Sequence, residues 1–304
     1  MMTKRHAFLI FAHNDYPVLS TLLEMLDDRR NDIYLHIDAR STDLCQQVRK
    51  ISLKESRLTM IPSIRVYWGD VSQVKVEYAL YEAAYRNGPY AYYHLLSGVD
   101  LPLKPMDEFH RFFAEHEGTE FVEFWNGAGH ERDTERKLTR YCIFPHHMRD
   151  RGTWVHALAA FLRNLCYVGQ RVFRIKRPLE MDFKKGAAWA SFTNDFCAAL
   201  LEQRDMLISR MKYVLCSDEF VIPTIAWQER FRHKVYTPEE GQAPNLREID
   251  WARGINGGPH TWRAEDIDCL MQSKNMFARK FSSSDMEVVK ELKARTGKNV
   301  PMSK

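Results

Sequence analysis

Two carboxylates stand directly before an apolar run in residues 216–224, which read CSDEFVIPT. A carboxylate held against apolar surroundings has a raised pKa and can accept a proton during a reaction. The same residues fit a helix start, where Ser217 caps the helix and Asp218 and Glu219 interact favourably with its dipole. Spacing alone favours the helix start, and a general base is the alternative.

Two cations lie between aromatic residues near the other end of the chain. Arg279 and Lys280 are flanked by Phe277 and Phe281, and such a pair can hold a diphosphate by charge. By itself this pattern is more often a solvated helix end. The glycine-rich phosphate loops, the HExxH zinc motif and the GxSxG nucleophile elbow are absent from the sequence, which removes the main support for several common enzyme classes.

The elements that must position these residues alternate between strands and helices. Short apolar runs at 7–12, 32–38, 58–66 and 91–96 are expected strands, and 18–26 and 72–85 have helical periodicity. This order predicts an α/β fold with a mostly parallel central sheet and helices on both faces. His13, Asp38, Ser97 and Asp100 follow three of the strands, so we expect a ligand cleft at the carboxyl ends.

Composition excludes several classes of protein. The chain has 304 residues, of which 45% are hydrophobic and 28% charged, unlike a disordered chain or a disulfide miniprotein. A net charge of +4 is far from the basic stripe of a dedicated nucleic-acid binder. Six scattered cysteines indicate thiols in a reducing compartment. Without repeats or linkers, residues 1–304 are expected to form a single domain.

Residues 155–176 are expected to form a basic amphipathic helix with Arg163, Arg171, Arg174 and Lys176. Such a helix can lie on an anionic membrane surface, although a surface helix with its apolar face toward the core is the favoured interpretation. The chain has no uncharged apolar stretch of about 18 residues and no signal peptide pattern. We therefore expect a cytoplasmic protein, with peripheral contact to the inner face of the membrane as the alternative.

Eight segments in order resemble one family, the core-2/I-branching N-acetylglucosaminyltransferases of glycosyltransferase family 14, which also contains the peptide O-xylosyltransferases. Residues 94–104, HLLSGVDLPLK, carry the resemblance most clearly. The other segments are 11–13, 36–38, 68–72, 186–189, 217–220, 245–251 and 277–281. Together they span roughly residues 7–283, nearly the whole chain.

The resemblance implies a GT-A-type nucleotide-sugar-binding fold, with a nucleotide-binding half in residues 1–105 and an acceptor and catalytic half in 106–304. It implies inverting transfer from a UDP-sugar with no metal or other cofactor. In agreement, Gly98 stands where the first Asp of an Asp-x-Asp motif with Asp100 would be. Glu219 inherits the role of catalytic base, and Lys280 that of the cation on the leaving diphosphate.

The resemblance also implies residues that contact the two substrates. The donor contacts are His13, Asp38, Trp68, Arg279 and a second basic residue, for which Arg253 is preferred over Arg263. The acceptor contacts are Glu123, Arg136 and Trp189. For Trp189, a flat face for a sugar ring and a plain core aromatic are equally weighted.

We expect the donor to be UDP-N-acetylglucosamine and the acceptor a hydroxyl of a glycan or lipid-linked glycan, in bacterial surface polysaccharide synthesis. UDP-xylose is the alternative donor. A catalytically silent glycan-binding protein is the alternative from another class, and a nucleotide-sugar hydrolase is a third. Binding alone needs neither a base nor a cation for a leaving group, so Glu219 and Lys280 together argue against the silent protein.

Overall fold

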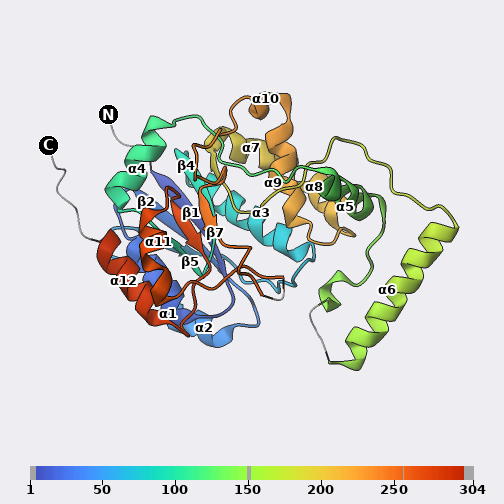
Figure 1. Cartoon of the computed structure of the whole chain (residues 1–304), viewed down its shortest axis with the longest axis horizontal. Coiled ribbons are helices and arrows are strands. Elements are labelled where there is room, and N and C mark those ends of the chain that lie inside the picture. The colour runs from blue at the N-terminus through green and yellow to red at the C-terminus, as the bar shows by residue number, and fades with distance from the viewer. Residues whose placement is uncertain (1–4, 149–151, 256, 298–304) are drawn as a thin grey trace.

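The computed structural model describes residues 5–148, 152–255 and 257–297 and contains two β-sheets with helices around them (Figure 1). The larger sheet has the order β3-β2-β1-β4-β6. Its strands are β1 (His6–Ala12), β2 (Asn31–Ile37), β3 (Arg57–Met60), β4 (Tyr92–Ser97) and β6 (Ser191–Thr193). Only β6 is antiparallel to its neighbour. The predicted α/β class with a mostly parallel central sheet is confirmed.

Helices cover both faces of the larger sheet, as predicted. One face packs against α3 (Ser72–Tyr85), α7 (Asn194–Glu202), α8 (Arg204–Met211) and α9 (Asp218–Trp227). The other packs against α1 (Tyr16–Met25), α2 (Thr42–Val48), α4 (Met106–Glu115), α11 (Ile267–Gln272) and α12 (Met286–Thr296). The remaining helices are α5 (Ala128–Thr139), α6 (Trp154–Val172) and α10 (Glu229–Arg232), with short turns η1 (Pro145–His147) and η2 (Ala264–Asp266).

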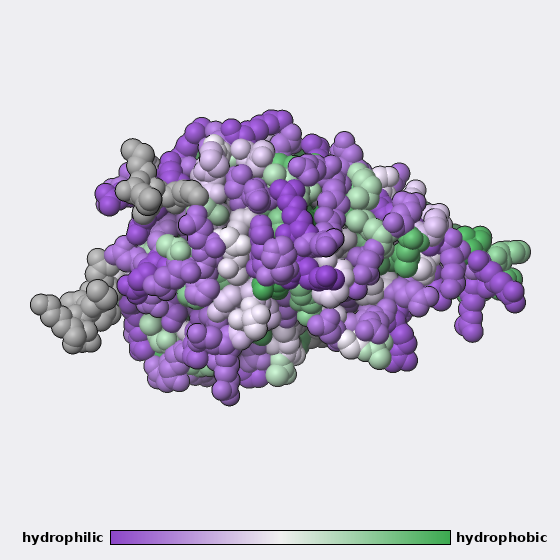
Figure 2. Space-filling model, turned by 90° about the horizontal axis from the view of Figure 1, so that it is seen from above, coloured by the Kyte–Doolittle hydropathy of each residue, from purple (hydrophilic) through white to green (hydrophobic). Residues whose placement is uncertain are grey.

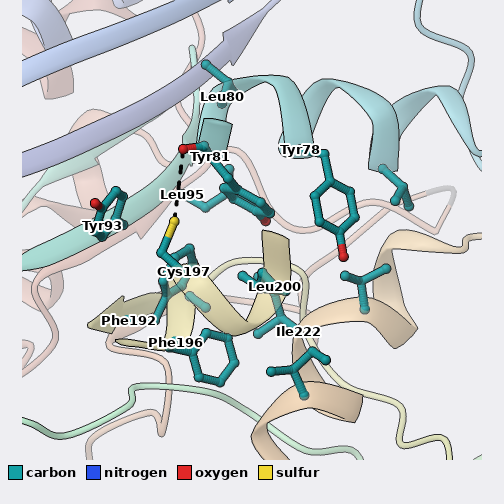
Figure 3. Close-up of a cluster of buried hydrophobic side chains, with 14 of the residues drawn as sticks. Tyr78, Leu80, Tyr81, Tyr93, Leu95, Phe192, Phe196, Cys197, Leu200 and Ile222 are labelled. Atoms are coloured by element: carbon teal, nitrogen blue, oxygen red, sulfur yellow. Dashed lines mark hydrogen bonds between the residues drawn. The ribbon is translucent and has the colours of Figure 1, made fainter. Parts of the chain in front are cut away.

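Side chains alternate along β1 because successive residues of a strand point to opposite faces of the sheet. Ala7 and Leu9 enter one hydrophobic core, and Phe8 and Ile10 enter the other. Figure 3 shows part of the first core, in which aromatic side chains of α3 and β6 surround the thiol of Cys197. These two cores fix the sheet between its helix layers.

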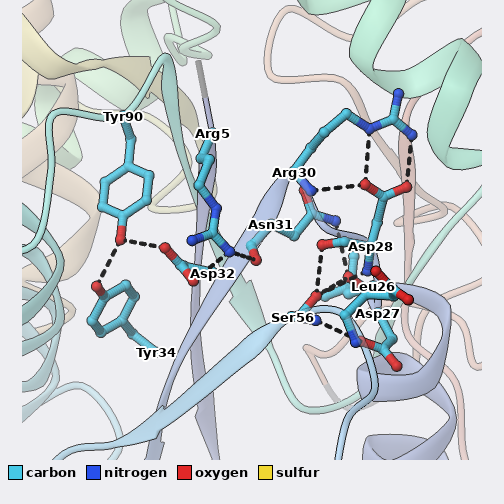
Figure 4. Close-up of polar contacts among 11 residues, drawn as sticks. Arg5, Leu26, Asp27, Asp28, Arg30, Asn31, Asp32, Tyr34, Ser56 and Tyr90 are labelled. Carbon is cyan, nitrogen blue, oxygen red and sulfur yellow. Dashed lines mark hydrogen bonds and ion pairs between the residues drawn. The ribbon is translucent and has the colours of Figure 1, made fainter. Parts of the chain in front are cut away.

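The amino ends of the strands are held by a network of polar contacts (Figure 4). The carboxylate of Asp32 accepts a hydrogen bond of 2.8 Å from the Tyr90 hydroxyl and lies 2.8 Å from the Arg5 guanidinium. The hydroxyls of Tyr34 and Tyr90 are 2.8 Å apart. These polar groups contact one another at the amino ends of the strands. In parallel sheets of this kind, ligands bind at the opposite, carboxyl-terminal edge.

A smaller sheet of order β5-β8-β7 lies at that opposite edge. It consists of β5 (Asp100–Pro102), β7 (Arg247–Ile249) and β8 (Phe277–Arg279). Asp100 pairs in register with Arg279 across the antiparallel β5–β8 ladder. Segments far apart in sequence therefore meet beside the ends of β1 and β4.

The predicted strand 58–66 is wrong in its second half, because β3 ends at Met60. Pro62 has no backbone N–H and cannot continue a ladder. The N–H of Val66 donates instead to the carboxylate of Asp38, at 3.0 Å. Residues 61–71 thus form a loop, here termed the β3–α3 loop.

Helix α6 is present where a helix was predicted, but the favoured interpretation of its packing is wrong. Arg163 and Gln170 are buried, whereas Trp154 and Phe161 are exposed. The side chain of Gln170 accepts a hydrogen bond from the N–H of Tyr141 at 2.7 Å and donates one to its carbonyl at 3.0 Å. The polar face of α6 is therefore the face that packs against the rest of the protein. Within the described ranges, no helix has the length and hydropathy to span a bilayer.

Gly98 provides a test of the contact between β1 and β4. A Cβ at this position would lie 2.7 Å from the Cβ of Ala12, closer than two carbon atoms pack. Gly98→Ala should therefore lower the free energy of unfolding by about 1–3 kcal/mol, measured by denaturant titration. Gly129→Ala is the matched control, because no atom lies within 4 Å of the added methyl group. Equal stability of the two variants would contradict the close contact.

Candidate functional site

The carboxyl ends of β1 and β2 bring together the predicted donor residues His13 and Asp38. The backbone N–H of Asp38 donates to the carbonyl of Ala12 at 2.9 Å. Burial acts to raise the pKa of the Asp38 carboxyl, but hydrogen bonds from Arg40 and the Val66 N–H outweigh it and lower the pKa to about 2. An ionised carboxylate is thus fixed at the edge of the sheet, while His13 is exposed beside it.

The β3–α3 loop connects this edge to the predicted catalytic segment. Beside the partly exposed Trp68, the carbonyl of Gly69 accepts a hydrogen bond of 2.9 Å from the N–H of Cys216. Gly69 has a φ of 72°, a conformation that favours glycine. The side-chain amide of Gln73 accepts from the Gly69 N–H and donates to Asp218 at 3.3 Å. The loop therefore contacts both Asp38 and the start of α9.

Glu219 lies in the first turn of α9, so the predicted helix start is confirmed, although Ser217 forms no side-chain cap hydrogen bond. The Oε2 atom of Glu219 is 3.1 Å from the Nζ atom of Lys137 and 3.3 Å from that of Lys185. No hydrogen bond to Oε1 is found among the described residues, and the side chain is 22% exposed. One carboxylate oxygen is held and the other is left for a ligand.

Asp133 of α5 completes this group of charges. Its Oδ2 atom lies 2.7 Å from the Lys185 ammonium and 3.3 Å from that of Lys137, and Arg136 donates to Oδ1 at 2.6 Å. Burial acts to raise the pKa of Asp133, but the hydrogen bonds from Lys185 and Arg136 hold it well below its usual range. We term Glu219, Lys137, Lys185, Asp133 and Arg136 the charge cluster. It contains one of the three predicted acceptor residues, Arg136.

Glu123, another predicted acceptor residue, is connected to the charge cluster by backbone hydrogen bonds. Its carboxylate accepts hydrogen bonds from the indole of Trp125 at 3.2 Å and the amide of Asn245 at 2.8 Å. The chain beside it pairs with Gly186, whose N–H donates to the carbonyl of Glu219 at 2.9 Å. Burial raises the pKa of Glu123, and the Trp125 hydrogen bond opposes this only in part.

The guanidinium of Arg279 is bound by other side chains of the protein. Its guanidinium lies 2.7 Å from Asp100 and 4.1 Å above the ring of Trp189, and it also donates to Ser97. Trp189 is stacked on Phe11 at 5.3 Å, which fits the core-aromatic alternative. The segment is a strand rather than a helix end. The donor role of Arg279 and the acceptor role of Trp189 stay predictions.

Lys280 lies beside the carboxyl end of β4. The N–H of Phe281 donates to the carbonyl of Val99 at 2.9 Å, and the carbonyl of Lys280 accepts from the N–H of Trp262 at 3.0 Å. The ammonium of Lys280 has no ion pair or hydrogen bond to any residue in 5–148, 152–255 or 257–297. A cation in this position can meet an anionic ligand without first breaking an internal pair.

Arg253 and Arg263, the two candidates for the second cation, both lie beside Trp262. Arg253 donates to Asp250 and to Asp266, the latter at 2.7 Å, and its guanidinium lies 5.5 Å from the ring of Trp262. Arg263 is exposed and lines a cavity of about 450 Å³ with Thr261, Ser282 and Ser284. The charge of Arg253 is already shared by two carboxylates. The preference for Arg253 over Arg263 as the second cation stays a prediction.

The residues at 98 and 100 do not form an acidic pair. No side chain fits at Gly98 without moving Ala12, and Asp100 is paired with Arg279. In the described part of the chain, no group of three or more His, Cys, Asp or Glu side chains is placed to hold a metal ion.

The carboxyl of Glu77 lies near that of Asp218, the residue before Glu219. Glu77 of α3 is 1% exposed, and neither of its carboxyl oxygens has a hydrogen-bond partner among the described residues. Burial, and then the charge of Asp218, raise the pKa of Glu77 well above its ordinary value. Burial, and then the charge of Glu219, raise the pKa of Asp218 to about 6. Asp218, one of the two carboxylates before the apolar run, thus has the raised pKa expected from an apolar environment.

Sequence reasoning missed the partners of Glu219. Lys137 lies within a charged helix, and Lys185 precedes the segment 186–189 that the resemblance includes, so neither stands out in the sequence. Asn245 and Arg247 belong to segment 245–251 of the resemblance, but their residue types alone predict no role. Each partner comes from a different element, and only the fold brings them together.

Comparison with known proteins gives a family match across most of the chain. The Core-2/I-Branching enzyme family model matches residues 6–276. Among solved structures, mouse xyloside xylosyltransferase 1 in its apo form is 11% identical, with 90% of this chain and 96% of that chain covered at a TM-score of 0.36. No curated protein sequence matches the chain.

The buried Glu77 predicts a pH dependence of stability. Its carboxyl binds a proton more tightly in the folded than in the unfolded state, so the free energy of unfolding falls as pH rises above the ordinary value of 4.5. Glu77→Gln imitates the protonated side chain and should raise Tm relative to wild type at pH 8, with little difference at pH 4. A change of about 1 kcal/mol in the free energy of unfolding corresponds to a change of roughly 2 °C in Tm for a chain of this size.

Glu240→Gln is the control for this measurement, because Glu240 is exposed and its replacement should leave Tm unchanged at both pH values. A Tm difference between Glu77→Gln and wild type that does not grow with pH would contradict the assignment.

Proposed function

We propose that this chain, which belongs to the Core-2/I-Branching enzyme family and is a glycosyltransferase, transfers N-acetylglucosamine from UDP-N-acetylglucosamine to a hydroxyl of a glycan with inversion at the anomeric carbon. The observation that carries the proposal is the placement of Glu219. Its Oε2 is held by Lys137 and Lys185, and its Oε1 remains for an incoming hydroxyl.

In the proposed step, the acceptor hydroxyl attacks C1 of the donor sugar from the face opposite UDP. The new bond joins the acceptor oxygen to C1, and the bond between C1 and the β-phosphate oxygen breaks. Glu219 takes the hydroxyl proton as general base. UDP leaves with the electron pair of the broken bond, so negative charge grows on its diphosphate.

The cation proposed to stabilise that charge is Lys280, acting with one of Arg253 and Arg263. Fixed charges aimed at a developing anion stabilise the transition state with little reorganisation. Among the described residues the Lys280 ammonium has no ion-pair or hydrogen-bond partner, which supports this role. We propose that the reaction needs no metal ion or other cofactor.

The proposed division of the chain follows the positions of these residues. His13 and Asp38 in residues 1–105 would line the uridine pocket and Trp68 would contact the donor, while Glu123 and Arg136 in 106–304 would contact the acceptor. The two halves would form a single domain, joined at the site through the β3–α3 loop. The contact between Gly69 and Cys216 supports this arrangement.

The proposed acceptor is a glycan or lipid-linked glycan of bacterial surface polysaccharide synthesis, reached by an enzyme that contacts the inner face of the membrane peripherally. UDP-xylose is the second candidate donor. A donor panel separates it from UDP-N-acetylglucosamine, because a ligand that binds only the folded protein raises Tm by mass action.

Glu219→Gln tests the base. The variant keeps the shape of the side chain but cannot accept the proton, so transfer should fall by roughly 10²–10⁴-fold. Binding of UDP, followed by its effect on Tm, should remain close to that of wild type. Glu240→Gln serves as the control and should keep full activity. A Glu219→Gln variant with more than about a tenth of the wild-type rate would rule out the base assignment.

Lys280→Ala tests the cation. With EDTA present, UDP-N-acetylglucosamine should raise the Tm of wild type more than UDP-xylose does, and this shift should shrink strongly in the variant. Transfer by the variant should be slow, and added Mg²⁺ or Mn²⁺ should not restore it.

Lys290→Ala is the control for charge, because Lys290 is an exposed residue of α12. If wild type loses all activity in EDTA, the metal-free mechanism is wrong. If no UDP compound raises Tm, with or without metal, the silent glycan-binding protein becomes the better proposal.

A further inference from the structure

The polar face of α6 packs against the protein, and its apolar face points away. Arg163 and Gln170 are buried, and the carbonyl of His147 is 2.7 Å from the ring nitrogen of His156. On the other side, apolar residues recur every three or four positions, as on one face of a helix. These exposed residues are Trp154, Leu158, Phe161, Leu165, Val168 and Val172.

This outward stripe is large, and about half or more of each of its side chains is exposed. The side chain of Trp154 is 77% exposed, that of Phe161 63% and that of Phe173, just past the helix, 76%. Figure 1 places α6 at one end of the molecule, and Figure 2 shows hydrophobic residues gathered at that end. An exposed apolar patch of this kind marks a binding surface.

Charge separates the candidate occupants of the stripe. Residues 152–179 contain no Asp or Glu but five Lys or Arg side chains, and among them Arg171, Arg174 and Lys176 are exposed near the end of the stripe. A second copy of α6 would bring the same positive charges and no acidic partner, whereas paired helices favour opposite charges beside their seam. An anionic surface complements these charges directly.

We propose that the outward face of α6 binds the surface of an anionic lipid bilayer. The helix lies in the plane of the interface, with its apolar stripe in the acyl boundary and its cations on the headgroups. At about 1.5 Å per residue, its 19 residues extend roughly 28 Å along that surface. Membrane binding by this face does not depend on the proposed chemistry, although it would hold the site near a lipid-linked acceptor.

Co-sedimentation of the full chain with lipid vesicles tests the proposal. Wild type should pellet with vesicles of phosphatidylcholine and phosphatidylglycerol, and much less with phosphatidylcholine alone. The double variant Phe161→Glu with Leu165→Glu should lose at least about tenfold in vesicle affinity, since burial of two large apolar side chains is lost. Because both side chains are exposed, Tm should not change.

Two further variants separate charge from apolar contact. Arg171→Glu with Arg174→Glu should weaken binding to the anionic vesicles and remove its salt dependence. Met206→Glu, at an exposed apolar residue of α8, is the control and should bind like wild type. Transfer to a soluble acceptor needs no membrane and should be the same in all four proteins, so a failure here is distinct from a failure of the proposed chemistry.

Two results would overturn the proposal. One is equal vesicle binding by wild type and by the Phe161→Glu, Leu165→Glu variant. The other is a dimer in solution that this variant dissociates, with no vesicle binding by wild type, which would make a second copy of the chain the occupant of the stripe.

Discussion

Beneath the site, the side chain of Arg247 is only 3% exposed and joins the two sheets. Its guanidinium donates to the carbonyls of Leu95 and Ala190, at 3.2 and 2.7 Å, and to the hydroxyl of Ser191 at 2.9 Å. Burial lowers its pKa to about 9, while the charges of Asp100 and Glu123 act to raise it. A buried cation persists only with hydrogen-bond partners such as these carbonyls and this hydroxyl. Asp100 in turn pairs with Arg279, and Glu123 accepts a hydrogen bond from Asn245.

Much of the larger sheet could be predicted from the sequence, because each parallel strand reads as a short apolar run that ends in polar residues. The end of β3 at Met60 is consistent with Pro62 in the sequence, but the hydrogen bond from the Val66 N–H to Asp38, just past β2, depends on the fold. The same limit applies to α6. Its apolar periodicity is plain in the sequence, but the direction of the stripe depends on hydrogen bonds to Tyr141 that no local pattern announces.

The candidate site was predictable in the segments that carry the family resemblance and not in its electrostatics. A resemblance could point to Glu219, but the lysines beside it lie 82 and 34 positions away in sequence. A carboxylate before an apolar run is expected to have a raised pKa, and burial raises the pKa of Asp218 in that segment and that of Glu77 in α3. Residue type indicates which groups can carry charge, whereas the fold decides how each charge is compensated.

The contact between Gly98 and Ala12 also bears on how a site of this kind can change over time. Replacing Gly98 by Asp would create an acidic pair in sequence, but its Cβ would collide with β1 and its partner Asp100 already belongs to Arg279. An acidic pair at this place would therefore require changes at Gly98, at Ala12 and in the ion pair between Asp100 and Arg279. The packing of two strands thus opposes an Asp-x-Asp motif at this position.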